Sequence, residues 1–222
     1  MSEPDHIISR LQRFQLRYFP RLRRTFQTLV EEGQHPHVLF IGCSGSRLVP
    51  YLLMDSGPGE LFIVRNVGNF VPPFDASQGY HGTAAAVEFA VLQLGVREII
   101  VCGHSHCGAV RALYTDPPAE ARHMARWLDL GRDAVLPVSI SDEALRRTEQ
   151  RSVALQLERL MCYPMVQRRV EAGELYLRGW HYLIETGKVL VLDVATGRVE
   201  PFDASLEAAK REDPLDGVNL LP

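Results

Sequence analysis

Short, continuous runs of apolar residues alternate with amphipathic stretches in the first half of the chain. The runs VLFIG at 38–42, LFIVRN at 61–66 and EIIVCGH at 98–104 are apolar at successive positions, as is typical of strands buried on both faces. Between the second and third runs, GTAAAVEFAVLQLG at 82–95 predicts a helix that ends at Gly95. Strand, helix and strand in this order predict parallel βαβ units.

Helical periodicity also appears before and after this region. Residues 5–31 predict one or two amphipathic helices, which Pro20 is expected to interrupt. Further helices are expected at 119–130, 141–162 and 164–172, then a strand pair within 175–194 that bends at Thr186 and Gly187. Residues 205–222 read as a short helix and a loose tail. The fold class is therefore α/β, with a mostly parallel sheet flanked by helices.

Length and charge narrow the class of protein. A chain of 222 residues with 46% hydrophobic content can bury a full core as one globular domain. Its net charge of −3 gives no strongly basic surface, so nucleic acid is not an expected partner. No apolar run approaches the ~20 residues of a membrane span, and the first residues lack the order of a signal peptide. We therefore expect a cytoplasmic protein without membrane insertion.

Two of the predicted strands end in loops that carry cysteine and histidine. Cys43 follows the first run in VLFIGCSGSRLVP, and His104 and Cys107 follow the third in GHSHCGAV. Loops at the carboxyl ends of strands in an open α/β sheet gather at one edge, so these side chains can meet. Two cysteines and a histidine, with a fourth position left to water, make an open zinc site. His106 competes as a ligand, but we expect it to be exposed or to lie beside the ligands, pointing away from His104 in an extended segment.

A cysteine nucleophile is the alternative chemistry for such loops. A helix expected to begin near Gly108 would favour the thiolate form of Cys107 through its N-terminal dipole. A phosphatase-type loop, however, needs a longer spacer between Cys and Arg to wrap backbone amides around phosphate. Here CSGSR and CGAVR each place three residues between them. Metal ligation is therefore the favoured interpretation.

The two loops and their surroundings resemble the β-class carbonic anhydrases, over about residues 30–202. The family pattern C-x-D-x-R is matched at Cys43 and Arg47, and H-x-x-C is matched at His104 and Cys107. The resemblance implies Zn²⁺ bound by Cys43, His104 and Cys107. It also implies reversible hydration of carbon dioxide to bicarbonate by zinc-bound hydroxide, as in a carbonate dehydratase.

The same resemblance implies a division of the chain and an assembly. We expect an N-terminal helical arm at 1–33, a zinc-binding α/β domain at 34–203 and a C-terminal tail at 204–222. The core would hold four parallel strands with a fifth at the edge. The family forms homodimers, often paired into homotetramers, in which the N-terminal helices pack on the partner subunit. Arg65 and Asn66 are expected to brace a loop or the interface.

The plant-like subgroup of the family implies further site residues. Gln34 lies where that subgroup hydrogen-bonds bicarbonate, and Gly108 would offer a backbone N–H to the substrate. An apolar pocket for carbon dioxide is expected from Phe62, Val67 and Phe89, with the site at the dimer interface. Phe89 stands where a tyrosine is common, so one polar group is missing. Three of these residues also have a structural interpretation: Gln34 as a turn cap, and Phe62 and Phe89 as core.

Gly45 departs from the family pattern. The acidic residue expected there pairs with Arg47 and accepts a hydrogen bond from water or hydroxide on zinc, and in some members it swings onto zinc at low pH. Glycine can do neither. Three interpretations follow: a carbonic anhydrase without this carboxylate, a hydrolase of a CO₂ analogue such as CS₂ or COS, or a catalytically silent zinc-containing binding or assembly protein. Gln34, Arg47 and Phe62 favour the first, because an inert scaffold would need only the ligands.

Overall fold

A single mixed sheet forms the centre of the molecule. The computed structural model describes residues 3–74, 79, 81–193 and 198–202, with the side chains of residues 3–5 left out. Within these residues the sheet has the strand order β2-β1-β3-β4-β5-β6. The strands are β1 (Val38–Cys43), β2 (Leu61–Asn66), β3 (Glu98–His104), β4 (Tyr176–Leu183), β5 (Lys188–Leu192) and β6 (Val199–Pro201). The first four are parallel and the last two antiparallel, so the expected core is confirmed and β6 adds a strand beyond the expected fifth.

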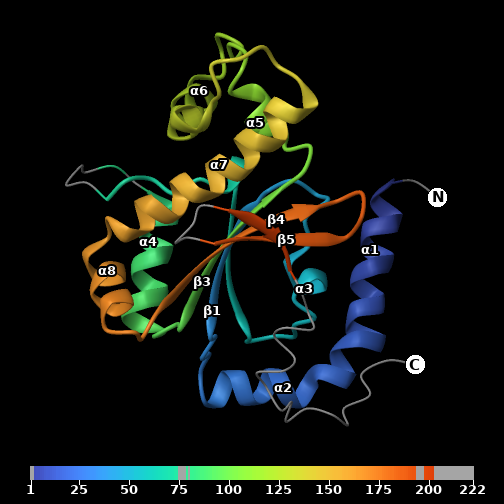
Figure 1. Cartoon of the computed structure of the whole chain (residues 1–222). Coiled ribbons are helices and arrows are strands. Elements are labelled where there is room, and N and C mark those ends of the chain that lie inside the picture. Colours follow the sequence, from blue (N-terminus) through green and yellow to red (C-terminus); the bar gives the residue numbers. More distant parts are fainter. Residues whose placement is uncertain (1–2, 75–78, 80, 194–197, 203–222) are drawn as a thin grey trace.

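Helices lie on both sides of this sheet (Figure 1). They are α1 (Glu3–Arg13), α2 (Phe19–Glu31), α3 (Pro50–Leu53), α4 (Gly82–Glu88), α5 (Gly108–Ala112), α6 (Arg122–Leu128), α7 (Asp142–Met161) and α8 (Pro164–Glu171). In Figure 1, α4, α7 and α8 lie on one side, and α3 and α1 on the other. In the described part of the chain, no helix combines the length and the apolar character needed to cross a membrane.

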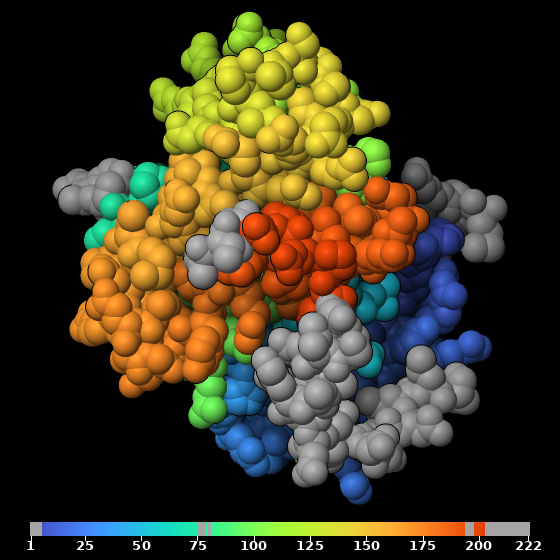
Figure 2. Space-filling model, in the orientation of Figure 1, coloured from blue at the N-terminus to red at the C-terminus, as the bar shows by residue number. Residues whose placement is uncertain are grey.

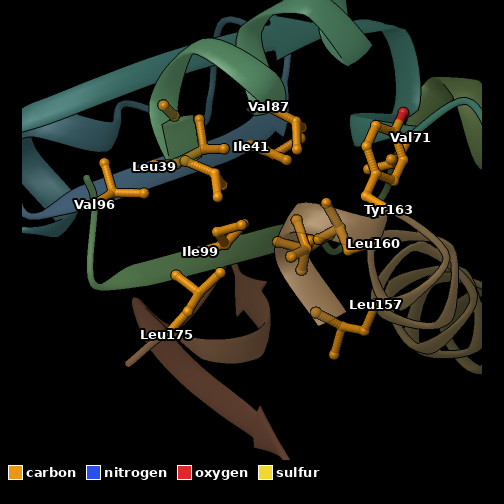
Figure 3. Packing of buried hydrophobic residues seen from close by; sticks show 14 of the residues in the cluster. Leu39, Ile41, Val71, Val87, Val96, Ile99, Leu157, Leu160, Tyr163 and Leu175 are labelled. Atoms are coloured by element: carbon orange, nitrogen blue, oxygen red, sulfur yellow. The ribbon is translucent and has the colours of Figure 1, made fainter. Parts of the chain in front are cut away.

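Successive residues of β1 and β3 point into two separate hydrophobic cores. Leu39, Ile41 and Ile99 enter the core beneath α4, α7 and α8 (Figure 3), whereas Phe40 and Ile100 enter the core on the opposite face. Each such buried side chain contributes about 1.5–3 kcal/mol. The expectation of burial on both faces is confirmed for these two strands. It is wrong for β2, which is only half-buried because it forms the edge of the sheet.

The N-terminal arm consists of α1, a π-helical turn at Phe14–Tyr18, and α2. Pro20 lies in the first turn of α2, where its missing N–H costs nothing, so the expected interruption takes the form of the π turn before it. Seven large apolar side chains of the arm are more than two-fifths exposed: Ile7, Ile8, Leu11, Phe14, Leu16, Tyr18 and Val30. The described part of the chain therefore leaves this apolar surface uncovered. The short helix expected at 205–222 lies outside the described residues.

The parallel strands run from the α2 end of the molecule to the α5 and α6 end (Figure 1). The segment around α6 protrudes at that second end (Figure 2). Residues placed at the carboxyl ends of β1 and β3 therefore lie beneath α5 and α6, far from the loop that joins α2 to β1.

Candidate metal centre

The three predicted ligands meet at the carboxyl ends of two neighbouring strands. Cys43 is the last residue of β1 and His104 the last of β3, and these strands pair in parallel. Cys107 follows three residues later, at the N-cap of α5. The ligand atoms of all three residues lie within 4.8 Å of one another, and all three side chains are buried. The two sulfurs are 3.9 Å apart.

His104 presents a free nitrogen to the two sulfurs. Its Nδ1 donates a hydrogen bond of 2.8 Å to the carbonyl of Ser105, which leaves the lone pair on Nε2. Nε2 is buried and has no hydrogen-bond partner among the described residues. A buried nitrogen lone pair beside two sulfurs is the donor set that zinc prefers, so the residues present fit this metal.

The pKa values of the two cysteines are shifted in opposite directions. The hydrogen bond shared with Cys107, with a smaller contribution from the backbone N–H of Gly45, lowers the pKa of Cys43 to about 3. The same interaction and burial raise the pKa of Cys107 well above its ordinary value. Backbone N–H groups in the first turn of α5 do lower it, but by less. At Cys107 the interaction with Cys43 and burial therefore outweigh the effect of the N-terminal turn of α5 when no metal is bound. The expected Cys107 thiolate on zinc stays a prediction.

Arg65 holds the first ligand loop through the backbone. From β2, its Nη2 donates to the carbonyls of Gly45 and Leu48 at 2.7 and 2.8 Å, and its Nε donates to the carbonyl of Cys43 at 3.1 Å. Three carbonyls of one short loop thus converge on a single guanidinium. The expected bracing role of Arg65 is confirmed.

Arg47 joins the two ligand loops. Its Nη2 donates to the carbonyl of His106 at 2.9 Å, so a backbone carbonyl of the second loop stands where a carboxylate partner was expected. His106 itself lies outside the ligand cluster, with its side chain 61% exposed and Nε2 3.8 Å from Glu185. Its backbone is left-handed, with φ of 56°. The exposure is as expected, but the segment is a tight turn rather than extended.

Gly45 lies directly against the ligands. A Cβ added at this position would be 3.4 Å from His104 Nε2 and 3.7 Å from Cys43 Sγ. Both are ordinary contacts, and the φ of Gly45 lies outside the left-handed region. The site therefore has the space and the backbone conformation for a side chain that this sequence does not supply.

Comparison with known proteins identifies the family of this centre. The family model described as carbonic anhydrase matches residues 38–189. The solved structure of the β-carbonic anhydrase CcaA is similar with a TM-score of 0.83 and 36% identity, over 90% of this chain and 100% of that chain. The chain belongs to the β-class carbonic anhydrase family.

Two other similar proteins extend this relationship. A carbonic anhydrase of Pseudomonas aeruginosa is 41% identical over 202 residues, which cover 86% of this chain and 89% of the relative. A structure described as one of two tetrameric β-carbonic anhydrases from Sordaria macrospora is 26% identical with a TM-score of 0.73, over 86% of this chain and 98% of that chain. The similarity thus includes nearly the whole length of these carbonic anhydrases.

The other candidate residues of this carbonic anhydrase family member fall into two groups. Val67 follows β2 directly, at the level of Cys43, because Cys43 is paired with Asn66. Gly108 follows Cys107, and a Cβ added at Gly108 would meet nothing within 4 Å. These two residues therefore lie at the metal end of the sheet, with open space beside the N-terminus of α5.

The second group lies at the opposite end of the strands. Phe62 is the second residue of β2, four residues before Asn66, which corresponds to about 13 Å along the strand. Phe89 stacks on Phe62 with ring centroids 5.8 Å apart. Gln34 is exposed in the loop before β1. Within one chain, these three residues are therefore separated from the metal ligands.

Proposed function

We propose that this chain catalyses the reversible hydration of carbon dioxide to bicarbonate with Zn²⁺ bound by Cys43, His104 and Cys107. The observation that carries the proposal is the buried set of two sulfurs and one nitrogen within 4.8 Å, in a chain whose whole α/β core matches the carbonic anhydrase family. When bound, zinc supplies a Lewis acid that lowers the pKa of a water molecule toward neutrality and so provides a nucleophile.

The residues of the chain supply position and environment for this step. Arg65 and Arg47 fix the two loops that carry the ligands, so the ligand atoms need little reorganisation. The backbone N–H of Gly108, in the first turn of α5 and beside open space, can orient an oxygen of the substrate or of bicarbonate. Val67 is 45% exposed at the same end and offers apolar surface for carbon dioxide.

A second subunit would complete the substrate pocket. Gln34, Phe62 and Phe89 lie at the amino ends of the strands, and the ligands lie at the carboxyl ends, so one chain cannot bring them together. We propose a homodimer or homotetramer in which the arm at 1–33 packs on the partner, because its apolar side chains are exposed. The Sordaria macrospora relative is described as tetrameric, which supports this assembly. We also propose a cytoplasmic location.

Gly45 supports a second candidate, a zinc-containing protein that does not hydrate carbon dioxide. A side chain at position 45 would lie against His104 Nε2 and Cys43 Sγ. Glycine, however, supplies no group there that can accept a proton or orient water. Such a protein would be a silent binding or assembly subunit, or a hydrolase of CS₂ or COS.

Stopped-flow hydration of carbon dioxide by zinc-loaded protein distinguishes these candidates. The natural chain, Gly45→Asp and the ligand-loss control Cys107→Ser are measured across pH. Activity of the natural chain well above Cys107→Ser supports the proposed function. A silent natural chain beside an active Gly45→Asp supports the second candidate, and COS hydrolysis then separates its two forms. If both are silent, the proposed function is wrong.

A further inference from the structure

A buried carboxylate lies behind the second ligand loop. Glu149 of α7 is only 3% exposed. Its Oε1 accepts a hydrogen bond of 2.9 Å from the backbone N–H of Cys107. Its Oε2 lies 3.0 Å from Nε2 of His181 on β4, which is 2% exposed. Two side chains from a helix and a strand, neither of them a ligand, are thus connected to the N–H of a metal-binding cysteine.

Two glycines in the sheet allow this approach of α7. A Cβ on Gly103 of β3 would lie 2.7 Å from Cγ2 of Val153, and a Cβ on Gly179 of β4 would lie 2.9 Å from Cδ1 of Leu157. Any larger residue at either position would have to displace these side chains of α7. Glu149 lies one turn before Val153 on the same helix. The glycines therefore set the distance at which its carboxylate reaches the loop after β3.

The hydrogen bond between Glu149 and His181 follows from the position of His181 in the sheet. In the parallel register of β3 and β4, His181 is paired with Gly103. Gly103 directly precedes the ligand His104 in β3. Because a carboxylate only accepts hydrogen bonds, Nε2 of His181 is the donor. Nδ1 of His181 is buried without a hydrogen-bond partner among the described residues. The histidine therefore makes one described hydrogen bond, and that bond is to Glu149.

Stability alone does not account for this pair. A buried acid–histidine pair loses its hydration, and apolar residues of similar volume at such positions are often equally stable or more stable. What apolar residues cannot do is accept the N–H of Cys107. The carboxylate fixes the backbone of Cys107 at the start of α5, and hence the direction of its Sγ. His181 in turn fixes the carboxylate, which has two oxygens to satisfy.

We propose that Glu149 and His181 are positioning residues that hold Cys107 in its ligand geometry and so set the zinc affinity of the site. This inference rests on the proposed function, because it takes Cys107 as a zinc ligand. Partners of this kind behind a metal ligand typically change metal affinity by about 10- to 100-fold when removed. Here the carboxylate binds the backbone N–H of the ligand Cys107, whereas such partners usually form a hydrogen bond with the ligating side chain itself.

Zinc affinity and the cobalt spectrum test the pair without reference to activity. Affinity is measured by competition with a chromophoric chelator at one fixed pH, and the thiolate-to-cobalt absorption band is recorded on Co²⁺-substituted protein. Glu149→Met is expected to bind zinc about 10- to 100-fold more weakly and to show a changed band. His181→Phe is expected to show the same changes to a smaller extent. His181→Gln can donate an amide N–H to the carboxylate, so we expect it to restore affinity and spectrum.

Gln156→Met is the matched control. Gln156 is also buried in α7, and its Oε1 accepts the backbone N–H of Val71 at 2.8 Å, away from the metal loop. Its loss should lower the melting temperature but leave zinc affinity and the cobalt band unchanged.

The outcomes separate this inference from the proposed function. If the natural chain binds zinc, and Glu149→Met and His181→Phe bind it as tightly as Gln156→Met does, the pair has only a structural role and this inference is wrong. If the natural chain itself binds no zinc, the proposed function is wrong as well. Should Glu149→Met not fold, the comparison of His181→Phe with His181→Gln decides: equal affinities overturn the inference, and rescue by glutamine supports it.

Discussion

Arg65→Met tests whether the first ligand loop is held through its backbone. The substitution keeps an unbranched apolar stem and removes three hydrogen bonds, to the carbonyls of Cys43, Gly45 and Leu48. A hydrogen bond to a charged group contributes about 1.5–3 kcal/mol. Arg65 is exposed, however, so water can replace part of these hydrogen bonds. We therefore expect the free energy of unfolding to fall by about 2–3 kcal/mol in total. For a chain of this length that corresponds to a melting temperature lower by about 4–12 °C.

The assay is thermal unfolding of the zinc-loaded protein, with zinc affinity measured alongside. Arg65→Lys keeps the charge but reaches fewer carbonyls than the planar guanidinium, so we expect an intermediate value. Arg146→Met controls for the loss of a surface arginine, since Arg146 forms only an exposed pair with Glu143 among the described residues, worth about 0–1 kcal/mol. If Arg65→Met unfolds at the temperature of Arg146→Met, the three hydrogen bonds do not hold the loop and the reasoning is refuted.

Three further predictions concern other parts of the molecule. Gly179→Ala should lower the unfolding free energy by about 1–3 kcal/mol in denaturant titrations, because its Cβ would overlap side chains of α7; an unchanged midpoint would contradict the close approach. The hydroxyl of Ser105 lowers the pKa of Glu185, so natural protein should exceed Glu185→Gln in melting temperature at neutral pH. That advantage should disappear as the pH falls through the lowered pKa, and a gap that persists in acid would be inconsistent. Leu11→Asp with Phe14→Asp should reduce the molar mass in light scattering, since both side chains are exposed apolar groups of the arm; unchanged mass would exclude the arm from the interface.

The sequence predicts the sheet well where burial and strand pattern coincide. β1 and β3 are apolar at successive positions because they are central and covered on both faces. β2 has the same apolar pattern but lies at the edge, which no local feature of LFIVRN indicates. β6 has three residues, too few for any periodicity. The ligands could be predicted because both loops follow strand ends, and the topology then requires them to meet.

The residues behind the ligands could not be predicted in the same way. Glu149 stands in the polar stretch RRTEQRS, where a glutamate would ordinarily face solvent. Its burial depends on how closely α7 approaches two glycines in different strands, a property of tertiary packing. The close approach of Cys43 and Cys107 has the same origin. The sequence indicates a helix N-terminus at Cys107, but it does not indicate that the two sulfurs lie 3.9 Å apart and shift each other's pKa.

These observations change what the loss of a carboxylate at Gly45 means. In this chain Arg47 and Arg65 donate to backbone carbonyls, so neither depends on a side chain at position 45 to hold the loops. The geometry of the ligands is therefore maintained without that carboxylate, and only its chemical contribution is missing. A Cβ at this position would make ordinary contacts with His104 and Cys43, so the backbone and the first side-chain atom of Gly45→Asp fit beside the ligands. Where Gly45→Asp binds zinc as tightly as the natural chain, a difference in hydration rate between the two proteins measures the chemistry of the carboxylate rather than the structure of the site.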